Sequence, residues 1–373
     1  MQTLAAFLSD YVLVVVLLAA AIYFTIRTRG VQFRMVGEML RLLMRSTASD
    51  PAVTAGAHHH GHISSFQAFA LSIASRVGTG NLAGVATAIA VGGPGAIFWM
   101  WVIAILGAAS AFVESTLAQL YKVRGPHSYM GGPAYYILKG LHNRHWAVTF
   151  AVLITLTFGF AFNSVQSNTI SDALGASFGV PHIATAITLA LLTLIIIWGG
   201  IRRVSRFSEI VVPIMAIAYI ILAAVIIVMN ITRFPEIIAL IIENAFGFRE
   251  AAGGTLGAAI IMGIKRGLFS NEAGEGSTPN AAATATVSHP VKQGLIQALG
   301  VYTDTLVVCT ATAFIILCSG VYTGGADGIQ LTQQAIDHEF GGNLGSIFVT
   351  IAIFFFAFTS IIANYYYGET HLR

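Results

Sequence analysis

Two apolar stretches of this sequence are interrupted by glycine and polar residues that could bind a charged ligand. The first interruption reads Gly78-Thr79-Gly80-Asn81. Glycine weakens a helix by about 1 kcal/mol relative to alanine, so this run predicts that the helix unwinds here. The half-helix that follows would present free N–H groups and the positive end of its dipole to a carboxylate. Close packing of small residues against a neighbouring helix is the alternative interpretation.

The second interruption contains carboxylates as well as glycine. Its candidate site residues are Phe269, Ser270, Asn271, Glu272, Gly274 and Glu275. Ionisable groups inside a membrane cost at least about 2.5 to 3.5 kcal/mol each, so they mark a site by default. We expect unwound carbonyls and Asn271 to meet an ammonium group. Either Glu272 or Glu275 would brace the break or face a nearby cation, Lys265 or Arg266. A re-entrant or cytoplasmic loop with solvated carboxylates is the alternative.

Polar side chains also stand at four other positions inside apolar segments. Asn163 and Gln166 are three residues apart and share a helix face, whereas Asn168 points elsewhere. Amides are costly to bury without partners, so this pair either joins helices or lines a pocket. Arg76 directly precedes the first interruption and needs a partner there. A gating pair with an acid such as Glu272 is one possibility, and snorkelling or another salt bridge is the other.

Composition shows what must position these groups. Charged residues make up 9% and apolar residues 56% of the 373 positions, which is more apolar surface than a soluble core requires. Runs of about 20 apolar residues cross a bilayer as helices. The sequence therefore predicts an all-α, polytopic membrane protein. We predict nine membrane segments, at 10–27, 66–92, 95–121, 146–175, 181–199, 207–230, 253–288, 292–318 and 344–367.

The basic residues predict how these segments are oriented. If the segments alternate, nearly all the loop lysines and arginines fall on one side, and Arg233 and Arg249 fall opposite. Cytoplasmic loops collect Lys and Arg, so the N-terminus is expected outside. The net charge of +3 forms no basic stripe, so no nucleic-acid partner is expected. The histidines at 58–60 and His62 lack carboxylate or thiolate neighbours and are expected to form a solvated loop rather than a metal site.

Three motifs in order resemble the alanine or glycine:cation symporters, also called the sodium:alanine symporter family, within the LeuT-like superfamily. The motifs lie at 77–86, 92–101 and 267–277. The resemblance implies sodium-driven uptake of alanine or glycine across the bacterial or archaeal inner membrane, with Na⁺ as coupling ion and no cofactor. It also implies a five-plus-five inverted repeat. We expect an extra helix and cytoplasmic loop at 1–65, a first repeat at 66–230, and the first three helices of a second, apparently truncated repeat at 231–373.

The resemblance also assigns expected roles to residues around the two interruptions. A Thr-Ser pair at the position of Thr359 and Ser360 helps hold sodium in LeuT-like carriers, together with carbonyls of the first broken helix, here those of Ala74 and Val77. Hydroxyls such as these otherwise bond back to their own helix. The resemblance also favours Asn163 as pocket lining, together with its partner at position 166.

The predicted mechanism is alternating access, in which substrate and Na⁺ bind between the two broken helices near the midplane. No covalent chemistry is required, so the chain is not expected to be an enzyme. An intramembrane enzyme using Glu272 and Glu275 with histidines is a rival hypothesis. The histidines fall in cytoplasmic loops or at helix ends, which argues against it. A transport-inactive fragment of a carrier is the other alternative.

Overall fold

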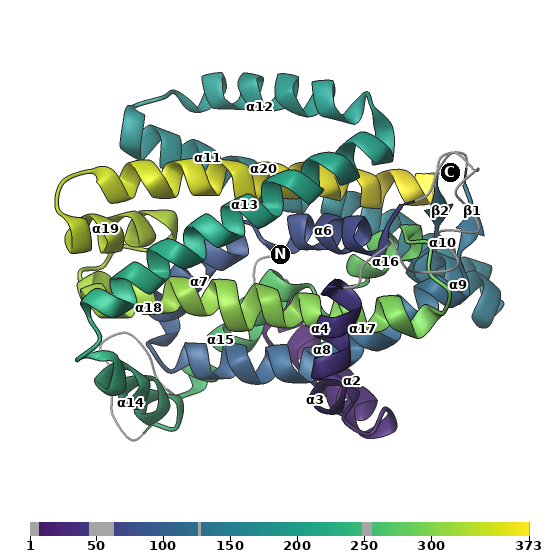
Figure 1. The fold of residues 1–373 in the computed structure, drawn as a ribbon, viewed down its shortest axis with the longest axis horizontal. Helices are drawn as coiled ribbons and strands as arrows, with labels where there is room; N and C mark the ends of the chain where they lie inside the picture. Colours follow the sequence, from purple (N-terminus) through teal and green to yellow (C-terminus); the bar gives the residue numbers. More distant parts are fainter. Residues whose placement is uncertain (1–6, 45–62, 126–127, 248–255, 373) are drawn as a thin grey trace.

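The structure is a computed structural model that describes residues 7–44, 63–125, 128–247 and 256–372. It is a bundle of helices in which α8, α20 and the rod formed by α17 and α18 run along the longest axis (Figure 1). The uninterrupted apolar helices are α2 (Val14–Arg27), α8 (Ala96–Leu120), α12 (His182–Ile197), α13 (Gly200–Met229) and α20 (Leu344–Leu372).

The other apolar segments are made of shorter helices in series, several of them π-helical. They are η1 (Leu8–Leu13); α6 (Ser65–Arg76), η2 (Gly80–Gly84) and α7 (Val85–Gly92); α10 (Arg144–Leu156), η3 (Thr157–Ala161) and α11 (Phe162–Phe178); α15 (Leu256–Asn271) and α16 (Thr278–Thr284); and α17 (Pro290–Val301), η4 (Tyr302–Cys309) and α18 (Thr310–Ser319). The connecting elements are α3 (Val31–Arg34), α4 (Val36–Met44), β1 (Val123–Arg124), β2 (Tyr129–Met130), α9 (Pro133–Gly140), α14 (Phe234–Ala245), η5 (Val321–Thr323) and α19 (Gly328–Phe340).

Five helical rods among the described residues are long and apolar enough to cross a membrane. They are Ala96–Leu120, Arg144–Phe178, Gly200–Met229, Pro290–Ser319 and Leu344–Thr370. Shorter apolar helices at Tyr11–Arg27, Gly80–Gly92 and His182–Ile197 account for further predicted segments. The prediction of an all-α, multi-pass membrane protein is therefore confirmed. The histidines at 58–62 and Arg249 lie outside the described residues.

Small residues allow the central helices to approach closely around α8. Gly263 of α15 lies against the backbone of Ala96, and a Cβ added at Gly267 would be 2.6 Å from Ile103. On the other side α8 packs against α16 and α17, while α11 lies along α20 and α13 along α6. Glycine and alanine at such contacts let membrane helices pack tightly without a hydrophobic driving force. The two interrupted segments are held inside this frame.

Candidate functional site

The first interrupted segment unwinds where the glycine run predicts. Helix α6 ends at Arg76, Val77 is extended with φ −77° and ψ 93°, and helical winding resumes at Gly80. The N–H of Gly78 donates to Asn81 Oδ1 at 2.9 Å. The N–H of Gly78, two residues before η2, therefore donates to a side-chain oxygen. The carboxylate of a ligand could accept from this N–H in the same way, because N–H groups at the start of a helix bind anions.

A hydrogen bond from the backbone of Thr79 to the side chain of Gln166 joins the first break to α11. The N–H of Thr79 donates to Gln166 Oε1 at 3.1 Å. The Thr79 hydroxyl is buried and has no hydrogen-bond partner among the described residues. Gln166, a site candidate from the sequence, therefore contacts the first break. Asn163 lies further out and its Oδ1 accepts from Asn364 at 3.0 Å, so it joins α11 to α20. Asn168 is exposed, as its position on the helix predicts.

The second interrupted segment unwinds over a longer stretch. Helix α15 ends at Asn271 and α16 begins at Thr278. Between them Glu272, Gly274 and Gly276 have φ values of 53°, 89° and 79°. A left-handed conformation is rare for a residue with a Cβ and costs of order 1 kcal/mol or more. Glu272 is held in it by its surroundings, which is typical of a functional site.

Glu272 braces both breaks through its carboxylate. Ser75 Oγ of α6 lies 2.9 Å from Glu272 Oε1, and Ser277 Oγ donates to Oε2 at 2.5 Å. Ser75 Oγ is also 3.1 Å from Asn364 Oδ1, so the brace reaches α20. Of the two acids left open by the sequence, Glu272 is therefore the one that joins the broken helices.

Arg76 is held by neutral acceptors. It is 2% exposed and donates to Thr278 Oγ1 at 2.9 Å and to the Gln297 carbonyl at 3.2 Å. Among the described residues it forms no hydrogen bond or ion pair with Glu272, which was the gating partner considered from the sequence. Arg76 thus ties the end of α6 to the start of α16 and to α17.

Asp304 is the residue that the sequence reasoning missed. It is not among the candidate site residues named from the sequence, but it is fully buried on η4 and contacts residues that flank both breaks. Its Oδ1 accepts from Asn81 Nδ2 at 2.7 Å, and its Oδ2 accepts from Ser270 Oγ at 2.9 Å and Thr305 Oγ1 at 2.9 Å. Asn271 joins the same group by donating to Thr305 Oγ1 at 3.2 Å. A lone acid in an apolar segment was the available signal.

Replacing Asp304 with asparagine is expected to lower the free energy of unfolding by at least about 1.5 kcal/mol, since hydrogen bonds to charged groups contribute about 1.5 to 3 kcal/mol each. The NH₂ group of the new asparagine would also face side chains that now donate hydrogen bonds to the Asp304 carboxylate. Thermal unfolding in detergent measures the loss, with Glu236→Gln on an exposed face of α14 as control. Equal melting temperatures for the two variants would show that Asp304 does not hold the breaks together.

The helix ends that flank the two breaks contact each other directly. A Cβ added at Gly80 would lie 3.0 Å from Ser270 Cα and 3.4 Å from the Phe269 ring. Phe269 stacks on Phe162 with ring centroids 5.1 Å apart, and Phe162 stacks on Phe158 at 4.5 Å. This aromatic layer separates the contact between the breaks from an open pocket on its other side.

That pocket has a volume of about 520 Å³ and is mostly apolar. It is bounded by the N-terminal helix, by α10 with η3, and by α15, and it reaches Phe269, Gly274, Glu275 and Lys265. Leu17 of α2 closes over the second break, because a Cβ at Gly274 would be 3.0 Å from its side chain. Glu275 and Gly274 therefore face this pocket, whereas Glu272 faces the other break.

A set of oxygen atoms surrounds the end of α6. Ser360 Oγ lies 2.9 Å from the Ala74 carbonyl and 3.5 Å from the Val77 carbonyl. The structure thus brings together three of the four residues expected at a cation site. The fourth, Thr359, donates to the carbonyl of Phe356 in its own helix at 2.9 Å. Hydroxyl and carbonyl oxygens are hard ligands, which suit Na⁺.

The far end of the second broken helix is clamped by α8. Gln119 Nε2 donates to the carbonyls of Ala282 at 2.5 Å and Ala285 at 3.0 Å, and Lys122 Nζ donates to the Ala285 carbonyl at 2.7 Å. Lys122 also lies 4.2 Å from the centre of the Tyr129 ring. A cation beside the last carbonyls of a helix complements its dipole. These contacts fix the end of α16.

Lys122 gives the clamp a pH dependence. Burial lowers the pKa of Lys122 to about 8 from its ordinary 10.5. The unfolded chain therefore binds this proton more tightly, and stability rises between about pH 8 and 10.5. In Lys122→Met this increase in stability with pH should be absent, whereas Lys139→Met should retain it. Melting temperatures across this pH range test the difference, and parallel curves for wild type and Lys122→Met would contradict it.

Comparison with known proteins gives a consistent result. The chain matches the sodium:alanine symporter family over residues 1–373. It is 55% identical to the probable sodium/glutamine symporter GlnT of Bacillus subtilis, over 96% of this chain and 74% of that protein. It is 53% identical to the amino-acid carrier protein AlsT of the same organism, over 98% and 77%. It is 42% identical to a sodium/proton-dependent alanine carrier protein of Bacillus sp., over 86% and 75%.

Proposed function

The chain belongs to the sodium:alanine symporter family, and from this premise we propose that it takes up alanine or glycine with Na⁺ across the inner membrane by alternating access. The family and the similar proteins are carriers, so the chain is an amino-acid transporter and not an enzyme. The observation that carries the proposal is the buried contact between the helix ends that flank the two breaks, the start of η2 at Gly80 and the last turn of α15 at Ser270.

The substrate carboxylate would bind at the first break. The N–H groups of Gly78 and Thr79 are free of the helix and now donate to amide oxygens of Asn81 and Gln166. An amino-acid carboxylate offers the same acceptor with a full charge, and it would gain from the dipole of the half-helix that follows. The unpartnered hydroxyl of Thr79 is a further donor at this point.

The substrate ammonium would bind on the side of the second break. Ser270 and Asn271 lie there, both fully buried and both linked to the Asp304 carboxylate. An acidic group one hydrogen bond away favours a positively charged ligand. Phe162 and Phe269 would then act as the gate between this site and the 520 Å³ pocket.

Sodium would bind at Ser360 with the carbonyls of Ala74 and Val77, joined by Thr359 after a change of its rotamer. The ion would then lie at the end of α6, directly before the residues that would bind the substrate carboxylate. Because ion and substrate would stabilise the same unwound segment, binding of one should favour the other.

The wider architecture is proposed on the same basis. We propose that residues 66–230 form the first repeat of a LeuT-like fold and residues 231–373 the first three helices of the second, with 1–65 as an added helix and loop. A break at the start of each repeat supports this, since such pairs mark transporter sites. The distribution of Lys and Arg supports an N-terminus outside the cell membrane.

Glutamine is a second candidate substrate. The relative at 55% identity carries a glutamine name, and the pocket beside Phe269 and Gly274 could receive a longer side chain. Counterflow in proteoliposomes with radiolabelled alanine, glycine and glutamine, with and without Na⁺, separates these candidates. We expect sodium-dependent exchange of alanine. Equal alanine exchange with and without Na⁺ would show that transport is not coupled to sodium. Exchange of glutamine but not of alanine would show that glutamine is the substrate.

A further inference from the structure

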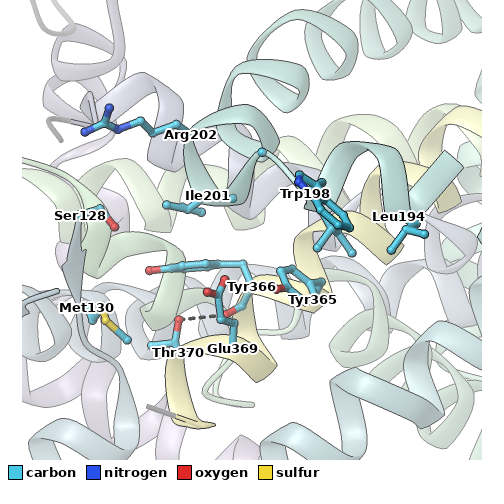
Figure 2. Close-up of a pocket in the computed structure, with 13 residues that line it drawn as sticks. Ser128, Met130, Leu194, Trp198, Ile201, Arg202, Tyr365, Tyr366, Glu369 and Thr370 are labelled. Atoms are coloured by element: carbon cyan, nitrogen blue, oxygen red, sulfur yellow. Dashed lines mark hydrogen bonds between the residues drawn. The ribbon is translucent and has the colours of Figure 1, made fainter. Parts of the chain in front are cut away.

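A second pocket lies at the end of the bundle where α20 finishes. It has a volume of about 620 Å³ and forms a wedge between α20, the turn that joins α12 to α13, and strand β2. Figure 2 shows that side chains from these separate elements surround one space. Its lining includes Ser128, Leu194, Trp198, Arg202, Tyr366 and Glu369.

Polar groups gather at one end of this wedge, where Met130 and Ile201 also lie, and the other end is apolar. Figure 2 shows Arg202, Ser128 and the Tyr366 hydroxyl on one side, and Trp198 and Leu194 on the opposite side. Tyr366 is 4% exposed, its hydroxyl has no hydrogen-bond partner among the described residues, and Figure 2 shows it between Ser128 and Thr370. A buried hydroxyl in this position is available to a ligand. The wedge therefore fits an amphiphile and not a small polar solute.

The apolar side of the wedge continues into the lipid-facing surface of α12. Leu194 is 56% exposed and Trp198 is 84% exposed, at the end of an apolar helix. Tryptophan at such a position is typical of the interface between hydrocarbon and headgroups. A ligand in the wedge could therefore have its polar part beside Arg202 and its chains in the bilayer.

We propose that this wedge binds one phosphatidylethanolamine molecule from the adjacent leaflet. The phosphate would lie at the Arg202 guanidinium with the hydroxyls of Ser128 and Tyr366, because arginine and hydroxyl groups are the usual donors to phosphate. Glu369 lines the same wedge, so its lining charges are balanced. A headgroup that carries an ammonium beside the phosphate matches this balance better than one with net negative charge.

The test is to purify the protein from membranes that contain phosphatidylethanolamine, phosphatidylglycerol and phosphatidylcholine, and to measure retained lipid by native mass spectrometry. We expect one retained phosphatidylethanolamine. Arg202→Ala should reduce it about fivefold, since a cation near a phosphate contributes about 1 kcal/mol. Arg203→Ala is the matched control, because it removes the same charge from the next residue of α13, which does not line the wedge.

Each alternative result would overturn the proposal. Equal loss in both arginine variants would indicate general surface charge, and no loss in either would place the lipid elsewhere. Preferential retention of phosphatidylglycerol or phosphatidylcholine would remove the headgroup assignment. Displacement of the lipid by millimolar glycerol phosphate would indicate an anion site and not a lipid site.

Discussion

Alanine in place of Gly78 is expected to abolish transport while the protein remains folded. The added Cβ would lie 2.6 Å from Ser360 Oγ and 2.8 Å from Gln166 Oε1. Gly78 has no positive φ, so its backbone accepts alanine, and the two side chains must move instead. One of them belongs to the proposed sodium site and the other accepts the Thr79 N–H. Both ligand sites would therefore be displaced by a single methyl group.

The expected loss is at least about 100-fold in the initial rate of sodium-driven alanine uptake, because overpacking costs about 1 to 3 kcal/mol and site contacts are lost as well. Gly159→Ala is the matched control, since a Cβ added at Gly159 would have no heavy atom of another segment within 4 Å. Circular dichroism and melting temperature check that both variants fold. Normal uptake by Gly78→Ala would place the site elsewhere.

Alanine in place of Ser360 is expected to weaken sodium dependence specifically. The substitution removes one oxygen of the proposed cation site and leaves the Ala74 and Val77 carbonyls in place. We expect the sodium concentration for half-maximal uptake to rise at least about tenfold, which corresponds to about 1.4 kcal/mol. Thr359→Ala should have a smaller effect. Among the described residues the Thr359 hydroxyl bonds within its own helix, whereas Ser360 Oγ lies near the Ala74 and Val77 carbonyls as well as 3.0 Å from the Phe356 carbonyl of its own helix.

The informative measurement for Ser360→Ala is a titration of alanine uptake with Na⁺ at saturating alanine. Thr303→Val serves as control, since the Thr303 hydroxyl donates to the carbonyl of Leu299 in its own helix. A loss of packing would lower the maximal rate at every sodium concentration and leave the half-maximal concentration unchanged. That outcome would refute the assignment of Ser360 as a sodium ligand.

The breaks in the helices were predictable because they depend on local chemistry. The glycine-rich stretches at 78–80 and 274–276 disfavour helical winding, and the structure unwinds beside Gly78 and across 272–277. The apolar composition determined the all-α membrane class in the same way, since a backbone in hydrocarbon must satisfy its own hydrogen bonds. Spacing also placed Gln166 and Asn168 on different sides of α11.

The partners of the charged groups could not be predicted. Arg76 was a candidate for pairing with Glu272, but it bonds to Thr278 and the Gln297 carbonyl. Glu114, Glu209 and Asp304 are all single acids within apolar segments, and no local feature distinguishes them. Asp304 nevertheless accepts hydrogen bonds from Asn81 and Ser270, which flank the two breaks. Its role follows from the π-helical turn η4, which places it between segments more than 30 residues away.

The sequence by itself therefore determined that the chain is a helical membrane protein, where two of its helices break, and which residue types stand at the breaks. Only the tertiary structure decided that Gly80 meets Ser270, that Ser360 reaches the carbonyls of Ala74 and Val77, and that Glu272 and not Glu275 bridges the breaks. The physical reason is that winding depends on neighbours within a helical turn, whereas a hydrogen bond between Ser75 and Glu272 depends on how whole helices pack.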